Sequence, residues 1–296
     1  MQVSARPLGA SGCVPEGDTV FVAATRLRQA LAGQPLTKTD FRVPALATVD
    51  LSGRSVDDVV PRGKHLLFRI EGGHTLHTHY KMDGSWHLYR HGERWGGPDF
   101  QVRAVLENEG WVAVGFRLAK VELLPTDNEH DIVGHLGPDP LRDDWDPAVA
   151  VANLSQHADE EIGTVLLDQR LIAGPGNVYK SEVCFLAGVH PRTLVREVPH
   201  LAKIVDLVAR LMRANKKIGN QMTTGDTRPG RERWVYGRSG RPCFRCGTKI
   251  VRAEQEGYGG ERVTFWCPTC QPFASVQERS TRDPHTREAK TRAQDG

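Results

Sequence analysis

The sequence predicts an α+β protein with an N-terminal antiparallel β-sandwich or barrel, flanking helices, and a C-terminal helical domain that ends in a small four-cysteine unit. Three observations predict this fold. Short runs of β-branched and aromatic residues, separated by Gly, Pro, Asp and Asn, fill residues 36–124. Apolar residues at helical spacing follow from residue 147. Four of the six cysteines form two Cys-x-x-Cys pairs near the C-terminal end.

Length and composition indicate a soluble globular protein of two domains. The chain has 296 residues, of which 25% are charged and 39% hydrophobic, as in ordinary folded proteins. No apolar run is long enough for a membrane helix, and residues 1–13 do not resemble a secretion signal. The net charge of +3 permits nucleic-acid binding without requiring it. Cys13 and Cys184 have no obvious partner, which favours a reducing compartment, and we expect a cytoplasmic location.

An amphipathic helix is expected from Thr19 to Leu31. Apolar side chains recur there at helical spacing, with Asp18 as a candidate N-cap and Gly33 as a candidate stop. The apolar face of such a helix is expected to pack on a core. Its positions are Val20, Ala23, Ala24, Leu27 and Leu31.

The segment from Leu36 to about Leu124 predicts short antiparallel strands. Regular short strands separated by turn signals favour a sandwich or a barrel. His77, His79 and His87 alternate in this segment, and we expect them at exposed strand positions rather than in a metal site. The expected strands are 41–43, 65–70, 75–79, 85–89, 100–106 and 111–116.

A linker rich in Gly, Pro and Asp leads from the strands to a helical domain. A polar loop follows the last helix, and the mixed charges after the cysteine unit predict a disordered tail. The expected helices are 147–154, 162–173, 177–187 and 199–217. The predicted boundaries are 15–134 for the β-domain, 135–148 for the linker, 149–234 for the helical domain, 235–271 for the cysteine unit and 272–296 for the tail.

The cysteine pairs predict a metal site. Cys243 and Cys246 form the first pair, and Cys267 and Cys270 form the second. Four thiolates bind zinc in a closed tetrahedron with no open position for catalytic water, so we predict one structural zinc ion. The metal would hold together a unit too small to bury its own core. Redox chemistry or two disulfides are the alternatives.

Five motifs follow one another along the chain: Pro15-Glu16-Gly17-Asp18, Pro61 to Leu67, Leu167 to Tyr179, Trp234 to Arg238, and Arg262 to Gln271. This ordered set, together with the cysteines, resembles the formamidopyrimidine-DNA glycosylase/endonuclease VIII family of DNA-repair enzymes. The resemblance covers nearly everything from the first motif to the last. It implies a helix–two-turn–helix motif in the helical domain, a β-hairpin zinc finger, and a hinged cleft for DNA.

The resemblance also implies a reaction: removal of a damaged base, then strand nicking. Pro15 would attack the anomeric carbon of the sugar with a free secondary amine, and the iminium formed would drive β- and then δ-elimination. Glu16 would protonate the sugar ring oxygen. Lys64 would carry a proton or contact phosphate, and Arg262 would bind the phosphate beside the lesion. Without the family pattern, Glu16 is a first-turn helix carboxylate and Lys64 a solvated charge.

Three further positions are expected to contact DNA. Asn177 would put its side chain and the helix amides on a phosphate, or would simply cap the helix. Glu182 falls where the family has an acidic active-site residue. Met82, in the loop 80–84, would fill the space left by an extruded base, or would pack on the sheet as a turn residue. Asp168 is expected to brace the motif and is not assigned to catalysis.

The proposed nucleophile requires a free amine at Pro15. A proline inside a chain has a tertiary amide nitrogen, which carries no proton and is not basic. We expect Val14 to mark the true start, because a GTG codon can initiate bacterial translation as methionine, whose removal exposes Pro15. Residues 1–14 are then a mis-assigned start or an extension. If they are retained, the alternative is a catalytically inactive protein that binds damaged DNA.

Two departures from the purine-directed branch of the family favour the endonuclease VIII branch. The first motif, at residues 15–18, is closer to endonuclease VIII, and the segment Gly115 to Ala119 lacks the Asp-Pro-Arg-Arg-Phe-Gly sequence of the purine-directed enzymes. Oxidised pyrimidines in double-stranded DNA are therefore the expected substrates, and oxidised purines are the alternative. We expect a monomer.

Overall fold

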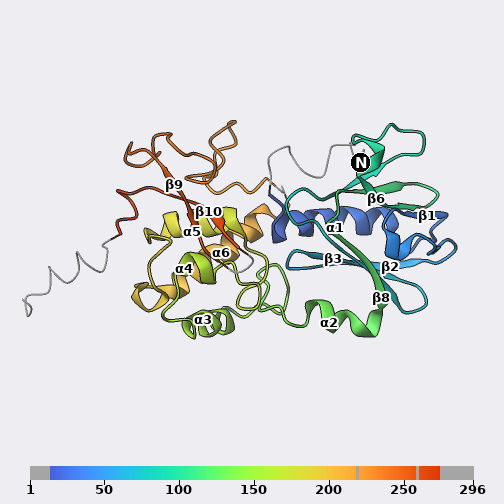
Figure 1. Cartoon of the computed structure of the whole chain (residues 1–296), viewed down its shortest axis with the longest axis horizontal. Helices are drawn as coiled ribbons and strands as arrows, with labels where there is room; N and C mark the ends of the chain where they lie inside the picture. Colours follow the sequence, from blue (N-terminus) through green and yellow to red (C-terminus); the bar gives the residue numbers. More distant parts are fainter. Residues whose placement is uncertain (1–13, 218–219, 258–259, 274–296) are drawn as a thin grey trace, which may run out of the picture.

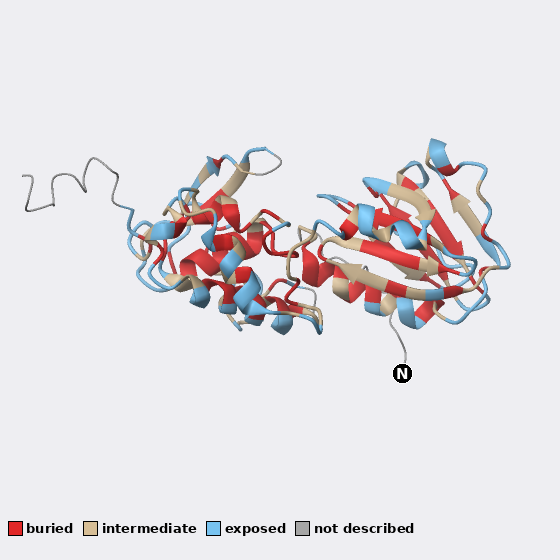
Figure 2. Cartoon of the chain, turned by 90° about the horizontal axis from the view of Figure 1, so that it is seen from below, coloured by how far each residue is buried: buried red, intermediate tan, exposed pale blue. Residues whose placement is uncertain are grey.

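A computed structural model describes residues 14–217, 220–257 and 260–273. The predictions for residues 1–13 and for the tail from 274 onward lie outside these residues. Figure 1 shows a β-rich N-terminal part beside a helical C-terminal part. Figure 2 shows that buried residues run through the interior of both parts and across the junction between them. No helix in the described residues has the length and apolar character needed to span a membrane.

The N-terminal part contains two four-stranded antiparallel sheets. Both sheets contribute apolar side chains to one core, which confirms the predicted sandwich. The first sheet has the order β1 (Lys38–Phe41), β6 (Val102–Glu107), β7 (Val112–Phe116), β5 (Ser85–Tyr89). The second has the order β2 (Val56–Arg62), β3 (His65–Ile70), β4 (His74–His79), β8 (Lys120–Pro125). Short 3-10 turns lie at Pro44–Leu46, Asp99–Gln101 and Thr126–Asn128.

Helix α1 (Gly17–Leu31) packs its apolar face into this core, as predicted. It begins two residues before the expected start, and Asp18 is not its N-cap. Glu16 occupies the N-cap position in an extended conformation but makes no side-chain capping bond, because its carboxylate is bound to another helix. Asp18 lies in the first turn and is buried.

Two of the eight strands of the sandwich, β2 and β8, were not among the predicted strands, although both lie within the predicted β segment. Each is an edge strand of its sheet and carries charged residues, so neither shows a clear apolar alternation. The expectation that His77 lies at an exposed position is wrong. His77 is 0% exposed, and its two ring nitrogens bond to His65 (2.9 Å) and Glu122 (2.7 Å).

The C-terminal part has its own core, formed mainly by α3 (Pro147–Ser155), α5 (Asn177–Ala187) and α6 (Leu201–Asn215). The predicted helix over 162–173 is wrong beyond its first turn: α4 spans only Ile162–Val165. Asp168 accepts a hydrogen bond from the backbone N–H of Arg170 (2.9 Å), and such side-chain bonds compete with helix continuation. The short helix α2 (Glu129–Val133) is tied to the second sheet, because Glu129 bonds to Arg69 and Thr75. The 3-10 turn Val195–Glu197 belongs to the helical half.

A hairpin of β9 (Val251–Gln255) and β10 (Arg262–Trp266) follows the helices and packs against α5. The linker is tied to the β2–β3 turn, since Asp139 accepts the backbone N–H of Gly63 (2.8 Å). The start of α1, the β2–β3 turn, α5 and β10 therefore meet at the junction of the two parts.

Candidate active site and metal centre

Glu16 joins the two halves at this junction. Its buried carboxylate accepts hydrogen bonds from the backbone N–H groups of Gly176 (2.7 Å) and Val178 (2.7 Å), and a longer one from Tyr179 (3.4 Å). These donors form the first turn of α5, where unpaired N–H groups and the helix dipole favour an anion. Burial raises the pKa of Glu16, while the charge of Lys64 and the amides oppose this. A raised pKa is what a proton donor at neutral pH needs.

Glycines allow the segment at the start of α1 and the segment before α5 to approach this closely. The N–H of Gly17 donates to the carbonyl of Gly174 (2.9 Å). A Cβ atom on Gly17 would lie 2.8 Å from the Cα of Gly174, and one on Gly176 would lie 2.7 Å from the carboxyl carbon of Glu16. Side chains at these positions would push Glu16 away from α5.

Two basic residues bring positive charge to the region of Glu16: Lys64 from the β2–β3 turn and Arg262 from β10. Lys64 follows the tight turn at Gly63 (φ 55°) and is partly buried. Burial lowers the pKa of Lys64, and the charges of Glu16 and Arg262 both act on it. Arg262 donates to the carbonyl of Glu261 (3.1 Å) and forms no ion pair among the described residues. Because Pro15 adjoins Glu16, the structure brings together the four residues assigned to catalysis.

Lys180 is a residue of this site that the sequence analysis missed. It is 1% exposed, and its ammonium group donates to the hydroxyl of Thr264 (2.6 Å) and, more weakly, to the carbonyl of Val263 (3.4 Å). Burial lowers the pKa of Lys180 to about 8, and the charge of Glu16 acts on it. Its position three residues after Asn177, on the same face of α5, was the available signal.

Asn177 is not the N-cap of α5. Gly176 holds that position, and Asn177 is the first helical residue. Its side-chain amide donates to the carbonyl of Val263 (2.6 Å), which ties α5 to β10. In this structure the backbone N–H groups of Gly176, Val178 and Tyr179 donate to Glu16 rather than to a phosphate.

Glu182 has no capacity left to contact a substrate. It is 0% exposed; one oxygen accepts the N–H groups of Val235 (2.8 Å) and Tyr236 (2.8 Å). The other accepts the N–H of Trp234 (2.8 Å) and the hydroxyl of Thr223. A carboxylate has about four acceptor sites, and all four are used. The expected substrate contact is therefore corrected: Glu182 closes the base of the loop between Thr223 and Trp234.

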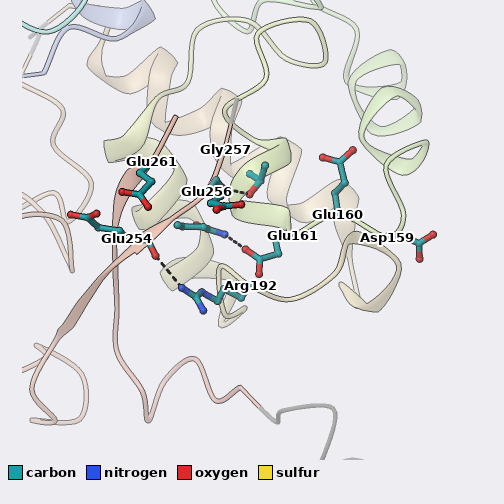
Figure 3. Close-up of a pocket in the computed structure, with 10 residues that line it drawn as sticks. Asp159, Glu160, Glu161, Arg192, Glu254, Glu256, Gly257 and Glu261 are labelled. Atoms are coloured by element: carbon teal, nitrogen blue, oxygen red, sulfur yellow. Dashed lines mark hydrogen bonds between the residues drawn. The ribbon is translucent and has the colours of Figure 1, made fainter. Parts of the chain in front are cut away.

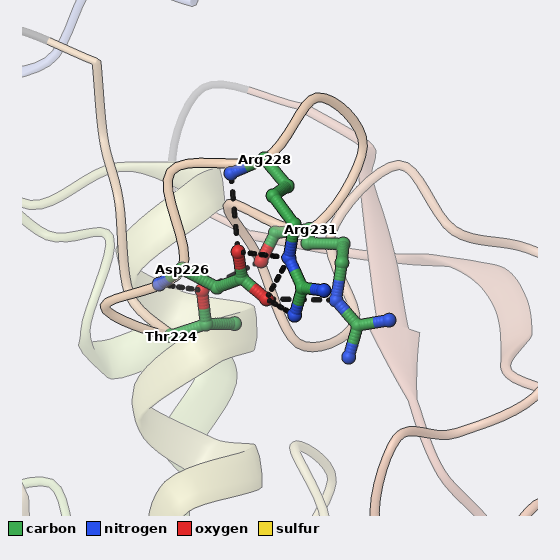
Figure 4. Close-up of polar contacts among 4 residues, drawn as sticks. All are labelled: Thr224, Asp226, Arg228 and Arg231. Carbon is green, nitrogen blue, oxygen red and sulfur yellow. Dashed lines mark hydrogen bonds and ion pairs between the residues drawn. The ribbon is translucent and has the colours of Figure 1, made fainter.

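Within that loop, one aspartate holds two arginines (Figure 4). The carboxylate of Asp226 bonds to the guanidinium groups of Arg228 (2.6 Å) and Arg231 (2.8 Å). These bonds hold the pKa of Asp226 well below its usual value. The backbone N–H of Asp226 also donates to the Thr224 hydroxyl (3.0 Å). The loop thus has an ordered, arginine-bearing tip.

Met82 lies on a second loop, between β4 and β5. It is 61% exposed, so it does not pack on the sheet as a turn residue. The turn is closed by the bond from the Gly84 N–H to the Tyr80 carbonyl (3.0 Å), and Arg117 donates to the carbonyl of Asp83 (3.1 Å). A braced loop therefore presents an apolar side chain to solvent.

The four predicted metal-binding cysteines are grouped at the base of the hairpin. Their sulfur atoms all lie within 4.8 Å of one another. Three of the S–S distances are 3.4 Å, 3.6 Å and 4.0 Å. Zn–S bonds of about 2.3 Å in a tetrahedron give S–S distances of about 3.8 Å, so the cluster fits a zinc ion. The residues are Cys243, Cys246, Cys267 and Cys270.

A pocket of about 940 Å³ lies elsewhere on the C-terminal part, between α4 and the hairpin (Figure 3). Carboxylates dominate its lining, and Arg192 is the basic residue among the lining side chains. A concentration of negative charge repels phosphates, so this pocket is unsuited to DNA. The acidic side chains are Asp159, Glu160, Glu161, Glu254, Glu256 and Glu261.

Comparisons with known proteins agree with the fold and the site. The formamidopyrimidine-DNA glycosylase N-terminal domain matches residues 14–118, and the formamidopyrimidine-DNA glycosylase H2TH domain matches residues 136–225. These matches define an enzyme of the DNA glycosylase and abasic-site lyase class that acts in DNA repair. The chain belongs to the formamidopyrimidine-DNA glycosylase/endonuclease VIII family, as its motifs predicted.

Individual relatives support this assignment. "Probable endonuclease 8 2" of Streptomyces coelicolor is 52% identical over 261 residues, which is 87% of this chain and 94% of the relative. "DNA-(apurinic or apyrimidinic site) lyase Nei2" of Mycolicibacterium smegmatis is 47% identical, covering 87% of this chain and 99% of the relative. A solved structure of the Lactococcus lactis formamidopyrimidine-DNA glycosylase bound to abasic-site DNA has the same fold, with a TM-score of 0.73, 24% identity, and coverage of 87% and 100%.

Proposed function

We propose that this enzyme excises oxidised bases, pyrimidines by preference, from double-stranded DNA and then nicks the strand by β,δ-elimination. The observation that carries the proposal is the convergence of Glu16, Lys64 and Arg262 beside Pro15 at the junction of the two halves. The relatives named endonuclease 8 and abasic-site lyase, and the abasic-site DNA held by the L. lactis protein of the same fold, support it.

The chemistry follows from the placement of these groups. The free amine of Pro15 attacks the anomeric carbon, and the damaged base leaves with the electrons of its glycosidic bond. The attacking nitrogen loses its proton, Glu16 donates a proton to the ring oxygen, the ring opens, and the nitrogen lone pair forms an iminium. Loss of a proton from the carbon next to the iminium expels the 3′ phosphate, loss of a second proton from the conjugated chain expels the 5′ phosphate, and water releases the enzyme. Lys64 and Arg262 hold the phosphates and stabilise their charge.

DNA contacts are proposed at the same junction. Arg262 has no carboxylate partner among the described residues and is available to bind a phosphate. Asn177 is partly exposed beside it and would turn its side chain from the Val263 carbonyl to a phosphate. The exposed Met82 would fill the gap that an extruded base leaves in the duplex.

Zinc is proposed as the ion held by the four cysteines, with a purely structural role. A chelator at millimolar concentration should then remove the ion and abolish DNA binding, while zinc restores it. We further propose a monomer in the bacterial cytoplasm, as expected for an enzyme with bacterial relatives that acts on the chromosome.

Borohydride trapping tests the proposal, using two forms of the chain on a duplex with one abasic site. One form begins at Met1. The other begins with Met in place of Val14, so that processing exposes the amine of Pro15. Only the shorter form should give a covalent adduct. If neither form traps while both bind DNA, the chain is an inactive damage-binding protein. Trapping by the longer, unprocessed form would point to Lys64.

The substrate preference needs a separate measurement. Single-turnover excision should be faster on duplexes with an oxidised pyrimidine than on those with an oxidised purine. The reverse order would support the purine-directed alternative without affecting the proposed chemistry.

A further inference from the structure

Asp18 is a second buried carboxyl group beside the proposed proton donor. It lies two residues after Glu16 and is 0% exposed. Neither of its oxygens meets a donor in good hydrogen-bond geometry among the described residues, and the Tyr179 side chain and the Thr19 N–H are the neighbouring groups that favour its charged form. A buried carboxylate without donors is costly, and such a group takes up a proton in preference to remaining charged.

The two carboxyl groups have opposite surroundings. Glu16 accepts the amides of α5, which stabilise its charged form, whereas Asp18 accepts none. Burial and then the charge of Glu16 raise the pKa of Asp18 to about 7, and the side chain of Tyr179 lowers it. Two neighbouring carboxylates repel each other, so ionisation of one favours retention of the proton by the other.

Charges from the neighbouring elements act on Glu16 rather than on Asp18. Lys64 from the β2–β3 turn and Lys180 from α5 both interact with Glu16, and Arg262 from β10 acts on both lysines. The cations therefore surround one member of the pair.

Asp18 has no cationic neighbour of this kind among the groups that shift its pKa. Helix α6, which also packs against α1, presents the methyl group of Met212 to the backbone of Gly17. From α5 it is Tyr179 that faces the carboxyl group. The surroundings of Glu16 thus stabilise its carboxylate form, whereas those of Asp18 do not.

We propose that Asp18 is a positioning residue for Glu16: the two buried carboxyl groups share one proton at neutral pH, and their repulsion keeps Glu16 able to donate. The inference rests on the proposed role of Glu16. When Glu16 gives its proton to the ring oxygen, the electrons of the C1′–O4′ bond pass to that oxygen, and the iminium forms at Pro15. Donation leaves both carboxyl groups ionised: the α5 amides donate hydrogen bonds to the Glu16 carboxylate and stabilise it, and the pair takes up one proton from water before the next turnover.

The Asp18→Asn variant tests this, because it keeps the shape of the side chain and removes its ionisation. Without the repulsion, Glu16 loses its proton more readily. The alkaline limb of single-turnover base excision should therefore move to lower pH by about one unit relative to wild type. Cleavage of an abasic site starts from an aldehyde and needs no proton on a ring oxygen, so the alkaline limb of that reaction should keep its pH position.

A structural role alone would give a different result. It would lower base excision by the same factor at every pH, and that outcome, or an unshifted limb, would overturn the proposal. If wild type itself neither excises a base nor traps at an abasic site, the proposed function fails, but the shared proton can still be measured.

Thermal melting provides that independent measurement. The pKa of Asp18 in the folded state lies above its ordinary value of 3.8, so its contribution to stability is present below that value and is lost as pH rises through 7. The Tm of Asp18→Asn relative to wild type should therefore increase between pH 4 and pH 8. In a Glu16→Gln background the increase should shrink, because the repulsion is gone. A pH-independent Tm difference, or the same increase in both backgrounds, would contradict proton sharing.

Discussion

At the scale of single residues, the observed contacts of Glu16 compete with its proposed role as a proton donor. As an acceptor of the α5 amides it is stabilised as a carboxylate, and as a proton donor it must carry a proton. Burial, which raises its pKa, makes the second role possible. Lys64, whose pKa burial lowers, supplies a cation that limits this effect. The balance between these groups sets the pH at which the donor works.

Glu16→Gln should separate the two reactions. A glutamine cannot supply the proton, so we expect base excision to fall by roughly 10²- to 10⁴-fold. Abasic-site cleavage should fall much less, because the aldehyde reacts with the amine directly. Single-turnover rates on the two substrates measure this. Equal losses on both would mean that Glu16 acts only by holding α5 in place.

Lys180 should control the stability of the protein at alkaline pH. Its folded pKa of about 8 lies below the ordinary value of 10.5, so the unfolded chain binds more protons between these values. At pH 7 the buried charge of Lys180 lowers the free energy of unfolding by about 3 kcal/mol. The free energy of unfolding therefore rises by this amount as pH increases from 8 to 10.5. Lys180→Met should flatten this rise in melting curves. Lys203→Met, an exposed position on α6, should leave it unchanged.

At the scale of elements, buried polar contacts connect segments that are distant in sequence. Asn177 and Lys180 bond to residues of β10, and Glu182 bonds to the segment that leads into the hairpin. Helix α5 therefore fixes the hairpin strand that carries Arg262 and the base of the loop that carries Arg228. These contacts are separate from the cysteine cluster, so the hairpin is held at two places.

Glu182→Ala should loosen the loop between Thr223 and Trp234. The change leaves the N–H groups of Trp234, Val235 and Tyr236 without acceptors, and these groups are buried or partly buried. The cost is about 3 kcal/mol. We expect trypsin to cleave faster after Arg231, as measured by the rate of limited proteolysis. Glu109→Ala, in an exposed turn, is the matched control. An unchanged cleavage pattern would show that other contacts hold the loop.

Elements with a strong local signal were predictable from the sequence, and those set by distant partners were not. The strands 65–70 and 85–89 and the helix Asn177–Ala187 agree with their predicted bounds. The helix over 162–173 failed because Asp168 bonds to a local amide, a choice that apolar spacing does not reveal.

The candidate site also divides into residues that local motifs predicted and contacts that depend on distant partners. The motifs identified the residues that meet at the junction, because the resemblance carries their order along the chain. Lys180 and the saturation of Glu182 were missed, because their partners lie 41 to 84 residues away in sequence. The burial of His77 was missed for the same reason. Pairing across such distances depends on how whole elements pack.

At the scale of the whole molecule, the two halves keep separate cores but share the junction at Gly17. The backbone bond from Gly17 to Gly174 and the bonds of Glu16 to α5 cross between them. The proposed catalytic groups of the two halves are therefore aligned only while the junction stays closed.

Gly17→Ala should open the junction. Its Cβ would lie 2.8 Å from a backbone atom of Gly174, which cannot move as freely as a side chain. Overpacking of this kind costs about 1–3 kcal/mol, or several degrees in Tm. Base excision and abasic-site cleavage should fall together. Gly110→Ala, where a Cβ meets only ordinary contacts at 3.7 Å and beyond, should keep both activities.

The acidic pocket between α4 and the hairpin has a consequence for how the enzyme meets DNA. Glu261 belongs to its lining, while the next residue, Arg262, belongs to the proposed active site. The side-chain charge of the hairpin therefore changes from negative to positive between these two residues. DNA that approaches the pocket is repelled by its carboxylates. Fewer encounters end in the wrong orientation, so the field raises the productive association rate more than the affinity. Added salt should remove this guidance by screening both charges.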